Sequence, residues 1–182
     1  MSAADIVLRD ARPTDAEAIA RLHVAVWRAT YRGLAPAEAV RILDVPYRLA
    51  RWREMLAAGS DRTILVAEAE SGIVAIGTCG APSVPALGSR GEINYLYVDP
   101  ALAGRGIGRR LMQALALRLD QRGYRSAALG VVEGNTAAIA FYERIGGRRI
   151  GHYTDPGPHW RSGNAIYAWD DLATLIAAGE RG

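Results

Sequence analysis

Residues 104–108 read Gly-Arg-Gly-Ile-Gly and give the strongest chemical signal in the chain, with two further arginines directly after them. The segment follows an expected strand that ends at Val98 and precedes an expected helix that begins near Ile107. Small residues at such a junction let a phosphate approach the backbone, and the free amides of the first helical turn point toward it. The spacing therefore predicts a phosphate-binding loop, with arginine side chains adding positive charge around it.

Other classes of phosphate loop do not fit this segment. A dinucleotide-binding GxGxxG needs a glycine where Arg109 stands, and no βαβ unit opens the chain. A protein-kinase loop fails at the same residue, and both it and the Walker loop need a lysine, which the sequence lacks altogether. An NAD(P)-dependent oxidoreductase is therefore disfavoured.

The elements that must position this loop follow from the pattern of apolar residues and turn signals. Strands are expected from residue 6 and at 63–69, 73–79, 92–98, 127–132, 148–153 and 165–169, with a hairpin turn at Ser71-Gly72. Helices are expected at 14–29, from 36 to about 56 with a break at Pro46, and at 106–122 and 135–145. Strands come first and then alternate with helices, which indicates an α/β protein of the α+β type: a mixed sheet with a parallel crossover near its middle.

The first helix is expected to begin with a capping box. Thr14 stands three residues before Glu17, so its hydroxyl can accept from the first turn while the glutamate reaches back. Ile19, Leu22 and Val26 then follow at helical spacing, which predicts that one face of this helix is buried.

Length and composition limit the remaining possibilities. The 182 residues are half apolar and 23% charged, as in one ordinary domain covering 1–182. A net charge of +3 gives no reason to expect a nucleic-acid or membrane partner. The start of the chain has no basic region, and the uncharged stretch 71–89 contains glycines and prolines, so we expect a cytoplasmic protein. One cysteine permits no internal disulfide, and the three histidines are not at metal spacing, so no metal is expected.

The sequence around the glycine loop resembles the GNAT superfamily of acetyl-CoA-dependent N-acetyltransferases. In that family the loop reads Gln/Arg-x-x-Gly-x-Gly/Ala, so Gly106 and Gly108 match the small positions, and Ala103 departs from the leading Gln or Arg. Residues 27–33, 135–146 and 166–172 resemble further family patterns: the first helix, the second coenzyme motif and the closing strand. The resemblance covers nearly the whole chain.

The resemblance implies a sheet that is flanked by helices and splayed between its fourth and fifth strands, where the pantetheine arm of acetyl-CoA pairs with backbone near Leu96 and Val98. It implies a phosphate cradle of backbone amides, an asparagine contact at Asn135, and a tyrosine hydroxyl, that of Tyr142, near the coenzyme sulfur. The expected coenzyme-binding residues are Leu96, Tyr97, Val98, Gly104, Arg105, Gly106, Ile107, Gly108, Arg109, Asn135 and Tyr142.

Two side chains are expected to carry proton transfer, because amine acetylation needs a base for the amine and a donor for the leaving thiolate. Tyr142 is the expected donor, and it shares a helix face with Asn135, two turns earlier. Glu92 is the expected base, acting through water; strand alternation would put it on one face with Asn94, Leu96 and Val98. The alternative for Glu92 is that it is an exposed carboxylate at the start of a strand, with no catalytic role.

The expected function is transfer of an acetyl group to a primary amine by direct attack in a ternary complex. The alternative is a non-catalytic acyl-CoA-binding or sensor protein of the same fold. The acceptor, a small molecule or a peptide amine, is not defined by the sequence, and a homodimer is possible because the family often forms dimers.

Overall fold

The computed structural model describes residues 6–57 and 61–177. The N-terminal residues that argue against a signal peptide lie outside this part of the chain. The structure contains a seven-stranded mixed sheet in the order β1-β2-β3-β4-β5-β7-β6, in which only β4 and β5 pair in parallel. The strands are β1 (Val7–Asp10), β2 (Thr63–Ala69), β3 (Gly72–Gly80), β4 (Gly91–Val98), β5 (Ala127–Val132), β6 (Arg148–Asp155) and β7 (Ser162–Trp169).

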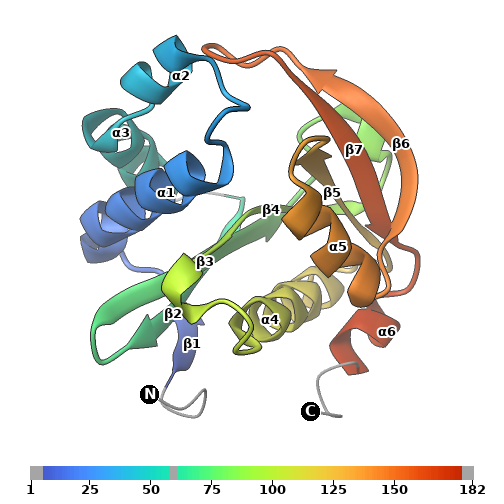
Figure 1. Cartoon of the computed structure of the whole chain (residues 1–182). Helices are drawn as coiled ribbons and strands as arrows, with labels where there is room; N and C mark the ends of the chain where they lie inside the picture. Colours follow the sequence, from blue (N-terminus) through green and yellow to red (C-terminus); the bar gives the residue numbers. More distant parts are fainter. Residues whose placement is uncertain (1–5, 58–60, 178–182) are drawn as a thin grey trace.

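Helices cover both faces of this sheet (Figure 1). They are α1 (Ala16–Thr30), α2 (Ala37–Ile42), α3 (Val45–Leu56), α4 (Ile107–Gln121), α5 (Thr136–Arg144) and α6 (Leu172–Ala177). The helices α4, α5 and α6 bury their apolar residues in the largest core cluster, on one face. On the other face, α1 and α3 pack over β2 and β3 around Trp52. No helix within the described residues is both long enough and apolar enough to cross a bilayer.

The central strands β4 and β5 separate soon after they meet. Their pairing is confined to Gly91 with Ala127 and Glu92 with Ala128. From Ile93 onward, β4 has β3 as its paired neighbour on one edge and a gap toward β5 on the other. The expected splay between the fourth and fifth strands is therefore confirmed, and it leaves backbone groups of β4 available at the gap.

A β-bulge in β4 changes which face its side chains occupy. Tyr95 has φ of +50°, and the register with β3 shifts between Ile76 and Thr78. The side-chain oxygen of Asn94 accepts the Tyr95 backbone N–H at 2.8 Å, which supports the irregular backbone. A bulge inserts an extra residue, so the alternation reverses beyond it.

The expectation that Glu92, Asn94, Leu96 and Val98 share one face is therefore wrong. Leu96 and Val98 pack with the α4 core, as Ile93 does before the bulge. Glu92 and Asn94 lie together on the opposite face, where the Asn94 amide donates to the Glu92 carboxylate at 3.4 Å.

Two further differences concern helix ends. Residues 13–15 form a 3₁₀ turn and α1 begins at Ala16, so the capping box of Thr14 and Glu17 is wrong. Asp15 takes the role expected of Glu17: its carboxylate reaches back to accept the Arg12 N–H at 2.7 Å, and it also pairs with Arg9. At the other end of the chain, α6 was not expected, because its six residues are too few to show a helical repeat in the sequence.

Candidate active site

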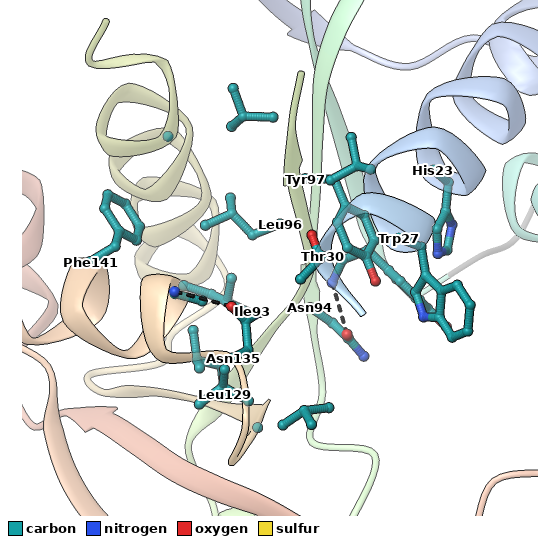
Figure 2. A pocket seen from close by; sticks show the side chains of 18 of the residues that line it. His23, Trp27, Thr30, Ile93, Asn94, Leu96, Tyr97, Leu129, Asn135 and Phe141 are labelled. Atoms are coloured by element: carbon teal, nitrogen blue, oxygen red, sulfur yellow. Dashed lines mark hydrogen bonds between the residues drawn. The ribbon is translucent and has the colours of Figure 1, made fainter. Parts of the chain in front are cut away.

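A cavity of about 1570 Å³ opens where β4 and β5 separate. Figure 2 shows that β4 divides its lining into two halves. Leu96 and Phe141 lie on the side of α4 and α5, whereas His23, Trp27 and Tyr97 lie on the side of α1. We call these the α4 half and the α1 half of the cavity.

The glycine segment lies at the mouth of the α4 half, at the start of α4. Gly106 is the residue before the helix and has φ of +77°, a left-handed conformation that favours glycine. A Cβ on Gly104 or Gly106 would meet no atom within 4 Å, so their backbone borders open space. A Cβ on Gly108 would lie 3.4 Å from Phe141 Cζ, which fits a helix packed closely against α5. The amides of this helix start can therefore receive a phosphate.

The helix α5 borders the same half. Asn135 caps it, with Oδ1 accepting the Ala138 N–H at 3.2 Å. Tyr142 lies two turns later, lines the cavity and is 7% exposed. The face-sharing predicted for this pair therefore agrees with the structure, in which both residues border the cavity.

Three tyrosines from different elements converge between the two halves. Tyr31 from the end of α1, Tyr97 from β4 and Tyr142 from α5 lie close enough for the charge of one phenolate to disfavour ionisation of another. Burial, and then the neighbouring Tyr31, raises the pKa of Tyr142 well above its ordinary value. Burial is also the main cause that raises the pKa of Tyr97. These phenols are therefore neutral hydrogen-bond donors at physiological pH.

Glu92 is 4% exposed at the start of β4, and both of its oxygens are hydrogen-bonded. Arg62 donates to Oε2 at 2.7 Å, and Ser83 donates through its backbone N–H to Oε2 and through its hydroxyl to Oε1. The exposed carboxylate considered as the alternative is therefore not what the structure contains. Glu92 lines the cavity as part of a buried polar network.

Aromatic rings form the outer wall of the α1 half. Trp160, in the β6–β7 loop, lies 5.9 Å from Trp27 and 5.2 Å from Tyr31 between ring centroids. His159 packs edge-on against Tyr47 at 5.3 Å. The wall joins α1, the start of α3 and the β6–β7 loop, and it provides flat apolar surface at the edge of the cavity.

His23 lies deeper in the same half and is 1% exposed. Its Nδ1 accepts the indole N–H of Trp52 at 3.1 Å. Burial, with a smaller contribution from the charge of Arg48, lowers its pKa well below the ordinary value. His23 is therefore a neutral packed histidine.

Every residue expected from the sequence to bind coenzyme or carry catalysis borders the cavity. The Tyr97 side chain, however, points into the α1 half, so only its backbone adjoins Leu96 and Val98. Arg48 also lines the cavity but was not expected from the sequence. A single arginine in a short helix forms no motif that would indicate a site. Among the described residues, no group of three or more His, Cys, Asp or Glu side chains could hold a metal ion.

Comparison with known proteins agrees with this geometry. Residues 19–147 match the model of the acetyltransferase (GNAT) family. YuaI of Bacillus subtilis, an uncharacterized N-acetyltransferase, is 27% identical over 171 residues, which cover 93% of this chain and 96% of YuaI. The mycothiol acetyltransferase of Salinispora tropica is 51% identical over a shorter segment of 57 residues, 31% of this chain and 19% of that protein.

Solved structures share the fold at lower identity. The PaiA N-acetyltransferase of Thermoplasma acidophilum, in complex with coenzyme A, has a TM-score of 0.69 at 18% identity, covering 90% of this chain and 97% of that one. YncA of Salmonella typhimurium, a putative acetyltransferase with acetyl-CoA, has a TM-score of 0.65 at 23% identity, covering 92% and 94%. The chain belongs to the GNAT acetyltransferase family. Its activity class is that of an acetyl-CoA-dependent N-acetyltransferase.

Proposed function

We propose that this protein transfers the acetyl group of acetyl-CoA to a primary amine by direct attack in a ternary complex. The observation that carries the proposal is the gap between β4 and β5, where an unpaired strand edge runs toward a glycine loop at a helix start. Donor and acceptor can enter from opposite sides of β4, because the cavity extends along both. When bound, acetyl-CoA supplies an acetyl group activated as a thioester.

The α4 half is the proposed coenzyme side. The amides at the start of α4 would hold the pyrophosphate, and Arg105 and Arg109 would add charge around it. The backbone of Leu96, Tyr97 and Val98 would pair with the pantetheine arm across the gap. Because Ala103 has no polar side chain, the cradle would depend on backbone contacts from Gly104 to Gly108.

Two residues are proposed to move protons. As the amine nitrogen bonds to the carbonyl carbon, Glu92 would take the amine proton through water. As the carbon–sulfur bond breaks, Tyr142 would give a proton to the departing sulfur. A backbone N–H of β4 would stabilise the developing oxyanion. Because Glu92 is already bound by Arg62, its role as a base requires a water that reaches it from the cavity side. The same ion pair could instead make Glu92 a residue that positions β4.

Acetyl transfer can be tested on a panel of amines by thiol release from acetyl-CoA and by the mass of the product, which rises by about 42 daltons for the added acetyl group. Thiol release that depends on the amine, with an acetylated product, would support the enzyme. Tight acetyl-CoA binding without turnover on any amine would favour the alternative, a non-catalytic acyl-CoA-binding protein. Absence of acetyl-CoA binding would contradict both.

A further inference from the structure

Two buried nitrogen atoms in the α1 half lack hydrogen-bond partners within the described residues: His23 Nε2 and Arg48 Nε. Because Nδ1 of the neutral His23 ring accepts from Trp52, its proton is on Nε2, which is a donor. Arg48 Nε is also a donor. A buried donor without a hydrogen-bond acceptor is costly, so two in one wall indicate a site built for a hydrogen-bond acceptor that the described residues do not supply.

Within residues 6–57 and 61–177, no carboxylate neutralises the charge of Arg48. Its guanidinium lies 6.0 Å from the ring centroids of both Trp27 and Tyr47, which flank it without accepting its hydrogen bonds. Neighbouring arginines on α2 and α3 are paired, Arg41 with Glu38 and Arg51 with Glu54.

The carboxylates near the α1 half are also engaged elsewhere. Asp44, one turn before Arg48, accepts the Tyr47 backbone N–H at 2.9 Å and caps α3. Glu92 is bound by Arg62. Asp155, which also lines the cavity, accepts the Gly157 N–H at 2.9 Å. The α1 half therefore contains a cation beside aromatic rings, and no carboxylate of the described residues pairs with it.

From this geometry we infer that the acceptor is a small amine bearing a carboxylate, an amino acid or a close analogue, and that Arg48 and His23 bind the carboxylate. The inference rests on the proposed acetyl transfer and adds the class of acceptor. A planar guanidinium suits a carboxylate because it can donate two parallel hydrogen bonds. The amine would then extend toward the gap beside β4.

The remainder of the acceptor would meet the aromatic wall. Trp27, Tyr31 and Trp160 present ring faces and edges but no charged group, so they favour an apolar or aromatic side chain. Positive charge at one end of this half and aromatic surface beside it match an amino acid with an apolar side chain.

The test uses acceptors that differ only at the carboxylate: L-phenylalanine, L-phenylalaninamide and 2-phenylethylamine, with the corresponding leucine series. Thiol release from acetyl-CoA gives kcat/KM for each. The wild-type protein should prefer the free acid over both other forms by about 10- to 100-fold, the range for hydrogen bonds to a charged group. The amine of L-phenylalaninamide is less basic than that of L-phenylalanine, so a larger fraction of it is unprotonated and reactive. This difference by itself favours the amide, so a preference for the free acid cannot be caused by it.

Three variants connect this preference to Arg48. Arg48→Met keeps a long apolar side chain and should abolish the preference, mainly by raising KM for the free acids. Arg48→Lys keeps the charge but loses the two parallel donors, and it should retain part of the preference for the free acid. Arg53→Met, an exposed arginine on the same helix that does not line the cavity, should leave the preference unchanged.

The outcomes separate this inference from the proposed function. If amines are acetylated equally with and without a carboxylate, or if Arg48→Met retains the preference, the carboxylate site is wrong and acetyl transfer stands. If no amine in the panel or beyond it releases thiol, the proposed function fails as well. A preference that is lost in Arg48→Met and kept in Arg53→Met supports the inference.

Discussion

Trp52 donates its indole N–H to Nδ1 of His23 over 3.1 Å, and both side chains are buried between α1 and the sheet. The bond leaves the proton of the neutral imidazole on Nε2. The Nε2 donor of His23 is therefore buried in the cavity wall, and the lone pair of Nδ1 is already used. Although it is the most buried histidine beside the proposed acceptor site, it is not suited to accept the amine proton.

The buried state of His23 predicts a pH dependence of stability. Its pKa in the folded protein is well below the ordinary value of 6.5, so the unfolded chain binds the proton more readily. The free energy of unfolding should therefore fall as pH drops below about 6.5, by at most about 1.4 kcal/mol per pH unit. Chemical denaturation between pH 7.5 and 5.5 measures this slope above the range in which ordinary carboxylates titrate.

The control for that slope is His23→Asn. The asparagine amide oxygen can accept from Trp52 in place of Nδ1, but the side chain does not titrate. The variant should show a flatter pH dependence in the same window. An equal slope in both proteins would mean that another group causes the loss of stability.

The glycine loop predicts a matched pair of substitutions at the two ends of α4. Gly106→Val should weaken acetyl-CoA binding about 10-fold or more, because it places a branched side chain in a left-handed conformation beside the proposed phosphate site. Gly123→Val carries a similar backbone strain, since Gly123 has φ of +88°, but lies outside the cavity lining. Calorimetric titration should show near-normal affinity for folded Gly123→Val. Equal weakening in both variants would assign the effect to strain in α4.

Glu92→Gln should lower kcat/KM for an amine by roughly 100- to 10,000-fold, the loss expected when a general base is removed. Acetyl-CoA affinity should change little, and the acidic limb of the pH–rate profile should shift or vanish. The profile is the deciding measurement, because Glu92 also binds Arg62 and Ser83. A lower rate with the acidic limb intact, together with reduced stability, would make Glu92 a positioning residue.

Tyr142→Phe should reduce kcat about 10-fold or more and leave acetyl-CoA affinity and thermal stability near those of the wild type, because it removes a donor but keeps the ring. Burial raises the pKa of Tyr142, so its ionisation should cause no loss of kcat on the alkaline side up to about pH 10. Tyr167→Phe is the control: Tyr167 is also buried and its ring lies 6.3 Å from that of Tyr142, but its hydroxyl donates to Glu143 and the residue does not line the cavity. Equal effects in both variants would exclude a specific role for Tyr142.

The parts of the fold that the sequence predicted are those with local signals. The hairpin at Ser71-Gly72, the break before α3 near Pro46 and the helix after the glycine loop each depend on residues next to one another in the chain. The splay of β4 from β5 was implied only by the family resemblance, because no local pattern encodes a gap between strands.

The parts that were missed depend on contacts between distant segments. A tyrosine at positive φ is uncommon, so strand alternation gave no warning of the bulge at Tyr95. Within the described part of the chain, Arg48 is unpaired because α3 places it beside Trp27 of α1. That packing between two helices cannot be inferred from the sequence of α3 alone. The individual roles proposed for Glu92, Asn135 and Tyr142 remain predictions.

The contact of Trp160 with Trp27 has an optical consequence. Three of the four tryptophans, Trp27, Trp52 and Trp160, border the cavity, and Trp169 is buried behind α5. Indole emission responds to the polarity and charge around the ring, and three of the four indoles lie beside the proposed acceptor site. Binding of an acceptor can therefore be followed by quenching or spectral shift without a label, even for amines that are never acetylated.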